Sequence, residues 1–396
     1  MSAADAGAGT PRRLLFILKN GPIYALSDHI DYQLRALAPE FDCEVWSQGP
    51  VDLEETPRPG LHARVVGSSN QYSLAALARY VWMVLRRIRV CSRQYPGSVA
   101  VVAHDPTKSG LIGMVAAAVA RAPLMVEVNG MYGNPDNYGP DGRQGGRFRL
   151  RLLRVIARIV LDRAAAVRCL FQGQLNDFVR LPRRAALRTF FDLPSLDRFR
   201  RCGEQPTVLF VGYPFFTKGV DVLIQAFEQV APDFPQWELL LIGHELEEPV
   251  RACATSSRVR VLRAMTNLQV ADYINRAGII VLPSRSEGMG RVLLEAAAAG
   301  KPRIGSRVGG IPTVICDGVD GLLFEKEDVR QLADCLRSLM SSEELRSSLG
   351  EAGRQRVETE FSADAYRGHV KEMLEAAFVV HAARGRTMRG LSGLVD

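Results

Sequence analysis

Short apolar runs rich in Val, Ile and Leu alternate with stretches of apolar residues at helical spacing along nearly the whole chain. This alternation is typical of parallel β-sheets covered by helices, because strands buried on both faces are apolar throughout. In the first half we expect strands at residues 14–18, 43–47, 63–67, 99–103, 124–128 and 166–171. In the second half we expect them at residues 208–212, 238–243, 259–262, 279–283, 302–305 and 322–324.

The two sets of strands predict an α/β protein with two doubly wound parallel-sheet domains. A length of 396 residues supports the division, since single cores stop growing beyond roughly 250 residues. We place a first domain at 1–190, a linker at 191–206 and a second domain at 207–360. Residues 361–396 form a C-terminal helix and tail, and we expect this helix to pack back toward the first domain. Because ligands bind beyond the carboxyl ends of such strands, the substrate cleft is expected between the domains.

The most informative segment is IIVLPSRSEGMGRVLLEAAAAGKP, which predicts a strand, a glycine loop and a helix. Gly288 and Gly290 let the backbone approach a ligand, and the helix that begins near Arg291 offers unpaired N–H groups to a phosphate. Glu287 in the loop and Glu295 in the helix can grip different parts of that ligand. A solvated loop acid and a surface helix acid are the alternative for the two glutamates.

Two further segments have the same order of strand, loop and helix. In VLFVGYPFFTKGVDVLIQAF, Lys218 stands before a helix, where it can neutralise a diphosphate while Gly219 leaves room beside it. In VGGIPTVICDGVDGLLF, Gly309 and Gly310 open a short helix. A solvated lysine and a tight turn are the alternatives for these two segments.

These segments resemble the retaining glycosyltransferases of family 4, the glycosyl transferases group 1, which have the GT-B fold. The resemblance spans most of the chain and is strongest where the family's paired glutamates match Glu287 and Glu295. Supporting matches are ADYINRAGIIVLPS and the Leu-Asp-Arg-Phe segment at 196–199. The resemblance implies two Rossmann-like domains that face each other across a cleft, with a nucleotide-sugar donor held by the second.

By this resemblance, Lys218 binds the donor diphosphate, Glu295 the ribose hydroxyls and Glu287 the donor sugar. The other implied donor contacts are Gly288, Met289, Gly290, Arg291, Tyr213 and Gly21. The implied reaction retains the anomeric configuration by attack on the same face, and the donor phosphate helps to take the acceptor proton. No acidic metal-binding motif stands out, so neither a metal nor another cofactor is expected.

The second domain departs from the family pattern at two positions. Tyr213 replaces an arginine that commonly partners the lysine on the diphosphate, and Arg285, Arg291 and Arg303 are candidates to supply that charge. Thr313 replaces a glutamate often found in the double-glycine segment.

The first domain contributes fewer candidates. Asn129 replaces a histidine that faces the donor sugar in the family, and its amide can hydrogen-bond a hydroxyl without carrying a proton. His104 ends a strand at the expected cleft and matches a second family position, with a purely structural hydrogen bond as its alternative. We expect these two residues to be catalytic together with Glu287 and Lys218. Only Gly21 is carried over from the acceptor-side loop, because one of the two usual glycines is absent.

The charge is uneven, since residues 1–200 carry +10 and the remainder −3. Two arginine-rich stretches, 143–168 and 73–95, have apolar residues at helical spacing, a pattern typical of helices on an anionic membrane. In the first, the stripe is Leu150, Leu153, Ile156, Ala157 and Val160. Packing of both stripes against the sheet is the alternative. The charge fits a glycan or lipid-linked acceptor. No nucleic acid partner is expected, because zinc-finger, RNP-like and heptad-linked basic patterns do not occur.

The composition is that of a globular protein, with 47% hydrophobic and 23% charged residues. The longest apolar run, 111–120, is shorter than a membrane span, and the first residues lack the apolar core of a secretory signal. We expect a cytoplasmic glycosyltransferase, peripheral on the inner face of the membrane, that contributes to cell-surface polysaccharide. The alternatives are a scaffold that binds nucleotide without transfer and a sugar-nucleotide epimerase or phosphorylase of the same fold.

Overall fold

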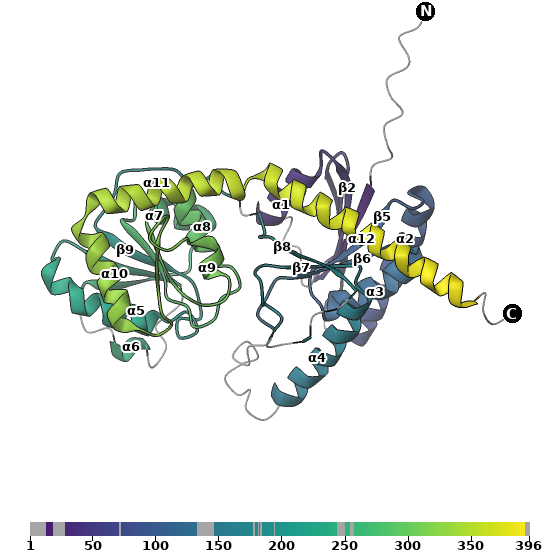
Figure 1. The fold of residues 1–396 in the computed structure, drawn as a ribbon, viewed down its shortest axis with the longest axis horizontal. Helices are drawn as coiled ribbons and strands as arrows, with labels where there is room; N and C mark the ends of the chain where they lie inside the picture. The colour runs from purple at the N-terminus through teal and green to yellow at the C-terminus, as the bar shows by residue number, and fades with distance from the viewer. Residues whose placement is uncertain are drawn as a thin grey trace, which may run out of the picture.

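In the computed structural model the chain forms two α/β lobes, and the C-terminal helix α12 (Ala363–Ser392) runs from the second lobe back across the first (Figure 1). The structure describes residues 13–18, 28–70, 73–132, 146–176, 179–180, 182, 184–193, 195–243, 250–253 and 257–392. Each lobe has its own sheet. This confirms the predicted α/β class with two parallel sheets.

The first lobe contains an eight-stranded sheet. In spatial order its strands are β3 (Leu53–Arg58), β4 (Leu61–Gly67), β2 (Phe41–Gly49), β1 (Arg13–Leu18), β5 (Val99–Ala103), β6 (Leu124–Val128), β7 (Ala166–Cys169) and β8 (Ala186–Thr189). Every pairing is parallel except that of β3 with β4. The sequence did not predict β3 and β8, because both are edge strands whose polar residues break the apolar run that marks a central strand.

The second lobe contains a six-stranded, fully parallel sheet. In spatial order its strands are β11 (Val259–Arg263), β10 (Glu238–Gly243), β9 (Thr207–Val211), β12 (Ile279–Leu282), β13 (Arg303–Ser306) and β14 (Leu322–Phe324). The central strands β9 and β12 are buried almost throughout. Because β9 and β12 are parallel neighbours, their carboxyl ends lie side by side at one edge of the sheet, where the predicted ligand loops begin.

Helices cover both sheets. In the first lobe they are α1 (Asp28–Leu37), α2 (Leu74–Gln94), α3 (Lys108–Ala120) and α4 (Gly146–Arg163). In the second they are α5 (Val220–Val230), η2 (Ala231–Asp233), α6 (Val250–Cys253), α7 (Asn267–Arg276), α8 (Arg291–Ala298), α9 (Ile311–Val314), α10 (Val329–Ser341) and α11 (Glu343–Glu360). In the described part of the chain, none of these helices has the length and apolarity that crossing a bilayer requires.

The apolar stripes predicted in the two arginine-rich stretches face the protein interior. On α4, Ala157 and Val160 are fully buried, and Leu150, Leu153 and Ile156 pack against the same core. On α2, Val84 and Ile88 of the predicted stripe are buried and Leu77, Val81 and Leu85 pack against the same core, whereas Leu74 at the first helical position is exposed. These stripes are therefore core positions and do not themselves form a membrane-binding surface, which corrects that interpretation.

Helix α12 packs against α1, β7 and β8 of the first lobe. The Arg367 guanidinium donates to the carbonyl oxygen of Ala36 at 2.6 Å, and Lys371 Nζ lies 3.0 Å from a carboxylate oxygen of Glu40. Val370, Met373 and Leu374 join the apolar cluster on this face of the sheet. The lobes are thus connected twice, by the segment before β9 and by the passage from α11 to α12.

Candidate active site

Three loops of the second lobe meet at the carboxyl edge of its sheet, after β9, β12 and β13. A Cβ atom at Gly219, after β9, would lie 2.1 Å from the carbonyl oxygen of Pro283, after β12. A Cβ atom at Gly309, after β13, would lie 1.8 Å from the carbonyl oxygen of Glu287. Both glycines have left-handed φ angles, of 68° and 53°, which other residues rarely adopt. The three loops therefore fix one another's position through contacts that only glycine allows.

Lys218 and Glu287 meet between these loops. Lys218 Nζ lies 2.7 Å from Glu287 Oε2, and both side chains are mostly buried. The Ser284 hydroxyl donates to Oε2 at 3.2 Å, and the backbone N–H of Gly288 donates to Oε1 at 3.2 Å. The carboxylate is thus oriented by three donors. A phosphate that binds Lys218 must compete with Glu287 for the ammonium group.

The N-terminus of α8 follows directly after this pair. Gly290, with φ of 78°, precedes the helix and supplies no side-chain cap. The first N–H groups of an α-helix have no acceptor within the helix, and with the helix dipole they favour an anion. Arg291 is exposed at the first helical position. Met289, an expected donor contact, has its side chain buried in the core of the second lobe, so only its backbone is available to a ligand.

Glu295 lies one turn into α8 and is partly buried. Desolvation raises the pKa of its carboxyl group, and the nearby positive charges of Arg291 and Arg198 oppose this rise. Arg198 belongs to the segment that connects the lobes. Glu295 is therefore a partly desolvated acceptor between two cations rather than a freely solvated surface acid.

Tyr213, which replaces the family's arginine, is exposed at the start of the loop after β9. Two of the three arginines considered as replacements are bound elsewhere, which corrects that expectation. Arg285 donates to both carboxylate oxygens of Asp221 at 2.7 Å. Arg303 is buried 2.9 Å from Asp320, and burial lowers the pKa of its guanidinium to about 10. Of the three, Arg291 is the one exposed at the helix start.

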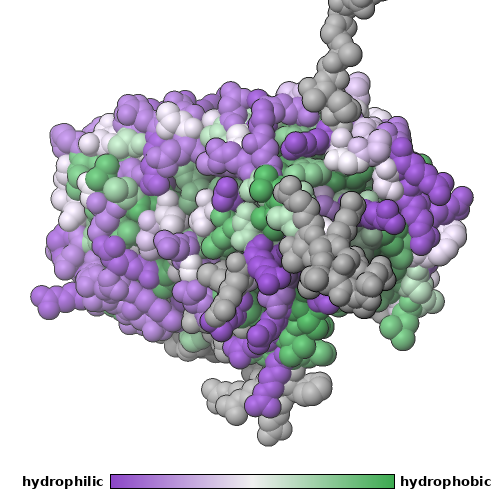
Figure 2. All heavy atoms as spheres, turned by 45° about the vertical axis from the view of Figure 1, so that its right-hand side comes forward, coloured by the Kyte–Doolittle hydropathy of each residue, from purple (hydrophilic) through white to green (hydrophobic). Residues whose placement is uncertain are grey.

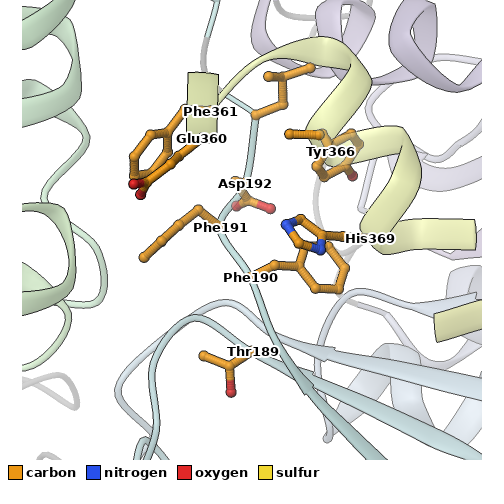
Figure 3. A pocket seen from close by; sticks show the side chains of 10 residues that line it. Thr189, Phe190, Phe191, Asp192, Glu360, Phe361, Tyr366 and His369 are labelled. Carbon is orange, nitrogen blue, oxygen red and sulfur yellow. The ribbon is translucent and has the colours of Figure 1, made fainter. Parts of the chain in front are cut away.

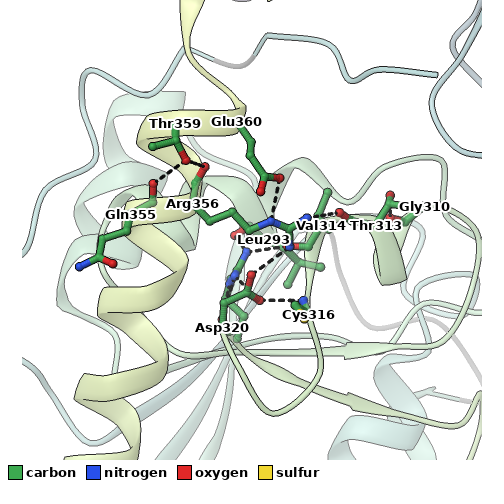
Figure 4. Close-up of polar contacts among 11 residues, drawn as sticks. Leu293, Gly310, Thr313, Val314, Cys316, Asp320, Gln355, Arg356, Thr359 and Glu360 are labelled. Carbon is green, nitrogen blue, oxygen red and sulfur yellow. Dashed lines mark hydrogen bonds and ion pairs between the residues drawn. The ribbon is translucent and has the colours of Figure 1, made fainter. Parts of the chain in front are cut away.

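Thr313, which replaces the family's glutamate, has a structural role. Its hydroxyl donates to the carbonyl oxygen of Gly310, the residue before α9, at 2.5 Å (Figure 4). Its carbonyl oxygen accepts from Arg356 Nη2 at 2.9 Å, and Arg356 Nη1 lies 2.9 Å from Asp320 (Figure 4). These contacts tie the double-glycine segment to α11.

His104 and Asn129 follow the neighbouring strands β5 and β6 of the first lobe. His104 Nδ1 lies 3.0 Å from Glu127 Oε2, and Asn129 Nδ2 lies 3.3 Å from both Nδ1 and the carbonyl oxygen of His104. The amide oxygen of Asn129 accepts a hydrogen bond from Arg168. Because a guanidinium group only donates, this contact fixes which end of the amide faces Arg168 and which faces His104.

Arg168, at the centre of this network, was not identified from the sequence. Its side chain is fully buried, with Nη1 2.7 Å from Asp192 Oδ1 and Nε 3.7 Å from Glu127 Oε1. Its guanidinium stacks on the ring of Phe190, 5.2 Å from the centroid. A charged residue inside the apolar run 166–171 was the available signal, because a buried arginine requires partners.

The two lobes meet where Gly288 faces Asn129. A Cβ atom at Gly288 would lie 3.9 Å from the carbonyl oxygen of Asn129 and 3.6 Å from Leu170 Cδ1. Leu170 and Phe171 of the first lobe are part of the apolar cluster that forms the core of the second. The structure thus brings the candidates of both lobes to one place. Gly21 lies outside the described residues.

A cavity of about 210 Å³ lies at the lobe junction, where β8 leads into the connecting segment and α11 passes into α12 (Figure 3). Phe190, Phe191, Phe361, Tyr366 and His369 line it together with Asp192, the partner of Arg168. The rings of Phe191 and Phe361 lie 4.9 Å apart, between centroids. None of the site residues named from the sequence lines this cavity.

Within the described ranges, no group of three or more His, Cys, Asp and Glu side chains is arranged as a metal site. The candidate site consists of one lysine, two glutamates, a helix N-terminus and the His104–Asn129 pair. Such a set can bind an anionic, hydroxyl-rich ligand.

Comparison with known proteins finds the family named above over the second lobe and a common fold over nearly the whole chain. Residues 197–356 match the family described as "Glycosyl transferases group 1". The D-inositol 3-phosphate glycosyltransferase of Xylanimonas cellulosilytica is 32% identical over 180 residues, 43% of this chain and 40% of the relative. The chain spans only about two fifths of the length of the curated relatives it matches first.

Solved structures match over nearly the whole chain. Sucrose-phosphate synthase from Thermosynechococcus elongatus superposes with a TM-score of 0.73 at 19% identity, covering 93% of this chain and 100% of that one. HepE of Anabaena, in complex with UDP and glucose, gives a TM-score of 0.68 at 16% identity, with 92% and 100% covered. At these identities the matches show the fold, which is the predicted GT-B fold.

Proposed function

We propose that the chain, whose residues 197–356 match the glycosyl transferases group 1, is a glycosyltransferase that moves a sugar from a nucleoside diphosphate donor to an acceptor with retention of configuration. One observation carries the proposal: Lys218 and Glu287 form an ion pair next to the N-terminus of α8. Gly288, beside this pair, faces Asn129 of the other lobe. Anion-binding and hydroxyl-binding groups of the second lobe thus lie next to an amide of the first lobe.

The donor diphosphate would lie across Lys218 and the N-terminus of α8. Lys218 Nζ, Arg291 and the first N–H groups of α8 supply positive charge where the leaving diphosphate gains negative charge. These groups can stabilise the leaving group without a metal ion. Glu295, on the same helix, would accept hydrogen bonds from the ribose hydroxyls. Its carboxylate is partly desolvated, so few water molecules compete with the hydroxyls for it.

The sugar would lie between Glu287 and Asn129. In the proposed reaction, the acceptor hydroxyl attacks the anomeric carbon on the face that the diphosphate leaves, the carbon–oxygen bond to the phosphate breaks, and the acceptor proton passes to a phosphate oxygen. Glu287, oriented by Ser284 and Gly288, positions the sugar and is not a covalent nucleophile. Asn129, with its amide fixed by Arg168, hydrogen-bonds a sugar hydroxyl, and His104 supports it.

The acceptor would be an anionic or lipid-linked molecule, such as a growing cell-surface glycan at the inner face of the membrane. The net charge of +10 on residues 1–200 favours such an acceptor on the first lobe. The name of one relative, D-inositol 3-phosphate glycosyltransferase, also points to an anionic acceptor. UDP is the first donor nucleotide to test, because HepE binds it in the same fold.

A scaffold that binds nucleotide without transfer is the second candidate. Tyr213 in place of arginine and Asn129 in place of histidine favour it, since both changes remove a charge or a titratable group from the site. The experiment that separates the two functions incubates the chain with nucleotide sugars and a lipid extract and follows release of the free nucleoside diphosphate. Acceptor-dependent release supports transfer, whereas nucleotide binding without release supports the scaffold. Isomerised donor formed without acceptor would indicate an epimerase.

A further inference from the structure

Helix α4 has a second apolar stripe, distinct from the one that packs on the core. Leu152, Val155 and Ile159 are exposed to 50%, 56% and 39%. At about 100° per residue these three positions fall within about 60° of one another around the helix axis, on the side opposite the buried Ala157. The stripe is therefore a continuous apolar face turned toward solvent.

Arginines border this stripe on both sides. Arg151 and Arg158 are exposed along one edge, and Arg149 and Arg163 are exposed along the other. The acidic residue of α4 is Asp162, whose carboxylate lies 4.0 Å from Arg158. An exposed apolar stripe between two rows of arginines is the pattern of a helix that lies in the interface of an anionic bilayer.

The neighbouring helices extend this face. Helix α3 packs against both α4 and α2, and it exposes Val115 to 43%. On α2, Trp82 is 61% exposed and stacks with Arg86, whose guanidinium lies 5.5 Å from the ring centroid. Figure 2 shows hydrophobic and strongly hydrophilic side chains next to each other in the lower part of the molecular surface. Helix α4 lies at this height in Figure 1.

We propose that Leu152, Val155 and Ile159, with the flanking arginines of α4, dock the first lobe on an anionic lipid surface. The positive charge of the flanking arginines favours anionic lipid over a second copy of the chain as the partner of this surface. A second copy of the chain, related by a two-fold axis through this face, would bring like-charged arginines together. Anionic headgroups instead neutralise them while the three apolar side chains enter the interface, and each arginine near such a surface contributes to the attraction.

Docking through α4 would also place the candidate active site relative to the membrane, an inference that rests on the proposed function. Helix α4 lies between β6 and β7, so it begins at the carboxyl edge of the sheet, where Asn129 follows β6. Leu152 lies in the second turn of the helix, near that edge. Docking through α4 would therefore hold the rim of the cleft against the membrane, where a lipid-linked acceptor is delivered.

Sedimentation with vesicles tests the docking itself, without donor or acceptor. The full chain is mixed with vesicles of phosphatidylcholine alone or with about one third phosphatidylglycerol. We expect binding to the anionic vesicles that falls steeply with salt. L152S/V155S and R151Q/R158Q should each weaken it at least tenfold. The controls L268S on α7 and R330Q on α10, both at exposed positions of the second lobe, should bind as the parent does.

Two results would overturn the proposal. Equal binding by L152S/V155S and the parent would show that another surface contacts the lipid. A concentration-dependent dimer that L152S/V155S abolishes, without vesicle binding, would show that a second copy covers the stripe. Because no sugar transfer is measured, a failure here leaves the donor-site proposal standing, and a failure of transfer leaves the docking result intact.

Discussion

Lys218 Nζ lies 2.7 Å from Glu287 Oε2, so the cation expected to hold the donor diphosphate is paired with the carboxylate expected to hold the donor sugar. Two charges at this distance interact strongly when both are mostly buried. The donor diphosphate must therefore displace Glu287 from Lys218, and the displaced carboxylate remains beside the place where the sugar would lie.

Replacing Glu287 with glutamine should separate nucleotide binding from transfer. Glu287→Gln removes the charge that competes with phosphate for Lys218, so UDP should bind several-fold more tightly, while transfer should fall by about 100-fold or more. Titration calorimetry with UDP and an initial-rate assay measure the two effects. Glu375→Gln, at an exposed position of α12, is the control. Weaker UDP binding by Glu287→Gln would contradict a competition between the carboxylate and phosphate.

Replacing Gly309 should damage the loop that holds Glu287. In Gly309→Ala the added Cβ would meet the Glu287 carbonyl oxygen at 1.8 Å, so we expect a loss of about 3 kcal/mol or more in the free energy of unfolding. Gly318→Ala is the matched control, because Gly318 also has a positive φ, of 73°, with no atom near the added Cβ. That variant should lose only about 1 kcal/mol. Urea unfolding measures both, and equal losses would contradict the steric argument.

Replacing Arg168 should cost far more stability than replacing a surface arginine. Arg168→Met leaves the carboxylates of Asp192 and Glu127 without their buried partner, a change that typically costs about 3–5 kcal/mol. Arg188→Met on the edge strand β8 removes a partly exposed side chain and should change the free energy of unfolding by less than about 0.5 kcal/mol. Chemical denaturation compares the two variants. A similar small loss in both would show that the Arg168 network contributes little.

Restoring the family's arginine at position 213 should strengthen donor binding. Tyr213 is exposed in the loop that carries Lys218, so Tyr213→Arg adds a charge near the diphosphate with little disturbance of the core. We expect the Kd for UDP to fall about three- to tenfold. Leu268→Arg adds the same charge at an exposed position of α7. If both variants gain equally, the effect is one of net charge and Tyr213 does not border the phosphate.

Glu295 should make stability depend on pH in a defined direction. Burial raises the pKa of this carboxyl group in the folded chain, so the folded state holds the proton more tightly than the unfolded state. The resulting stabilisation is present below the unfolded pKa, about 4.3, and is lost as the pH rises through the higher folded pKa. Glu295→Gln should therefore gain stability relative to the parent as the pH rises from about 3 to 7. Thermal unfolding across this pH range measures the effect, with Glu375→Gln as control. A stability difference between Glu295→Gln and the parent that did not change with pH would contradict the account.

The sequence was most informative where one physical rule dominates. Central parallel strands such as β9 and β12 are apolar on both faces, and their ends place Lys218 and Glu287 at the same edge. Edge strands β3 and β8 escaped prediction because half of their surface is not buried. The exposed stripe of α4, which is Leu152, Val155 and Ile159, was not identified from the sequence either, since periodicity gives the angle between residues but not which side faces the sheet.

Contacts between side chains of different loops were predicted least well from the sequence. Neither the Lys218–Glu287 ion pair nor the contact of Gly288 with Asn129 follows from spacing, because they join loops that only the folded lobes bring together. Arg285 and Arg303 were plausible phosphate ligands by charge alone. Their engagement with Asp221 and Asp320 depends on distances that the sequence does not contain.

The most direct test of the central claim, that the second lobe holds a nucleoside diphosphate donor, is thermal unfolding with UDP, GDP, ADP and their sugar conjugates. A ligand at about 100 times its Kd should add roughly 2.7 kcal/mol of stability. We predict a shift with one base, lost in Lys218→Ala and in Glu295→Ala and retained in Lys326→Ala, at an exposed position. No shift with any nucleotide, or a shift that survives in both site variants, would contradict the claim.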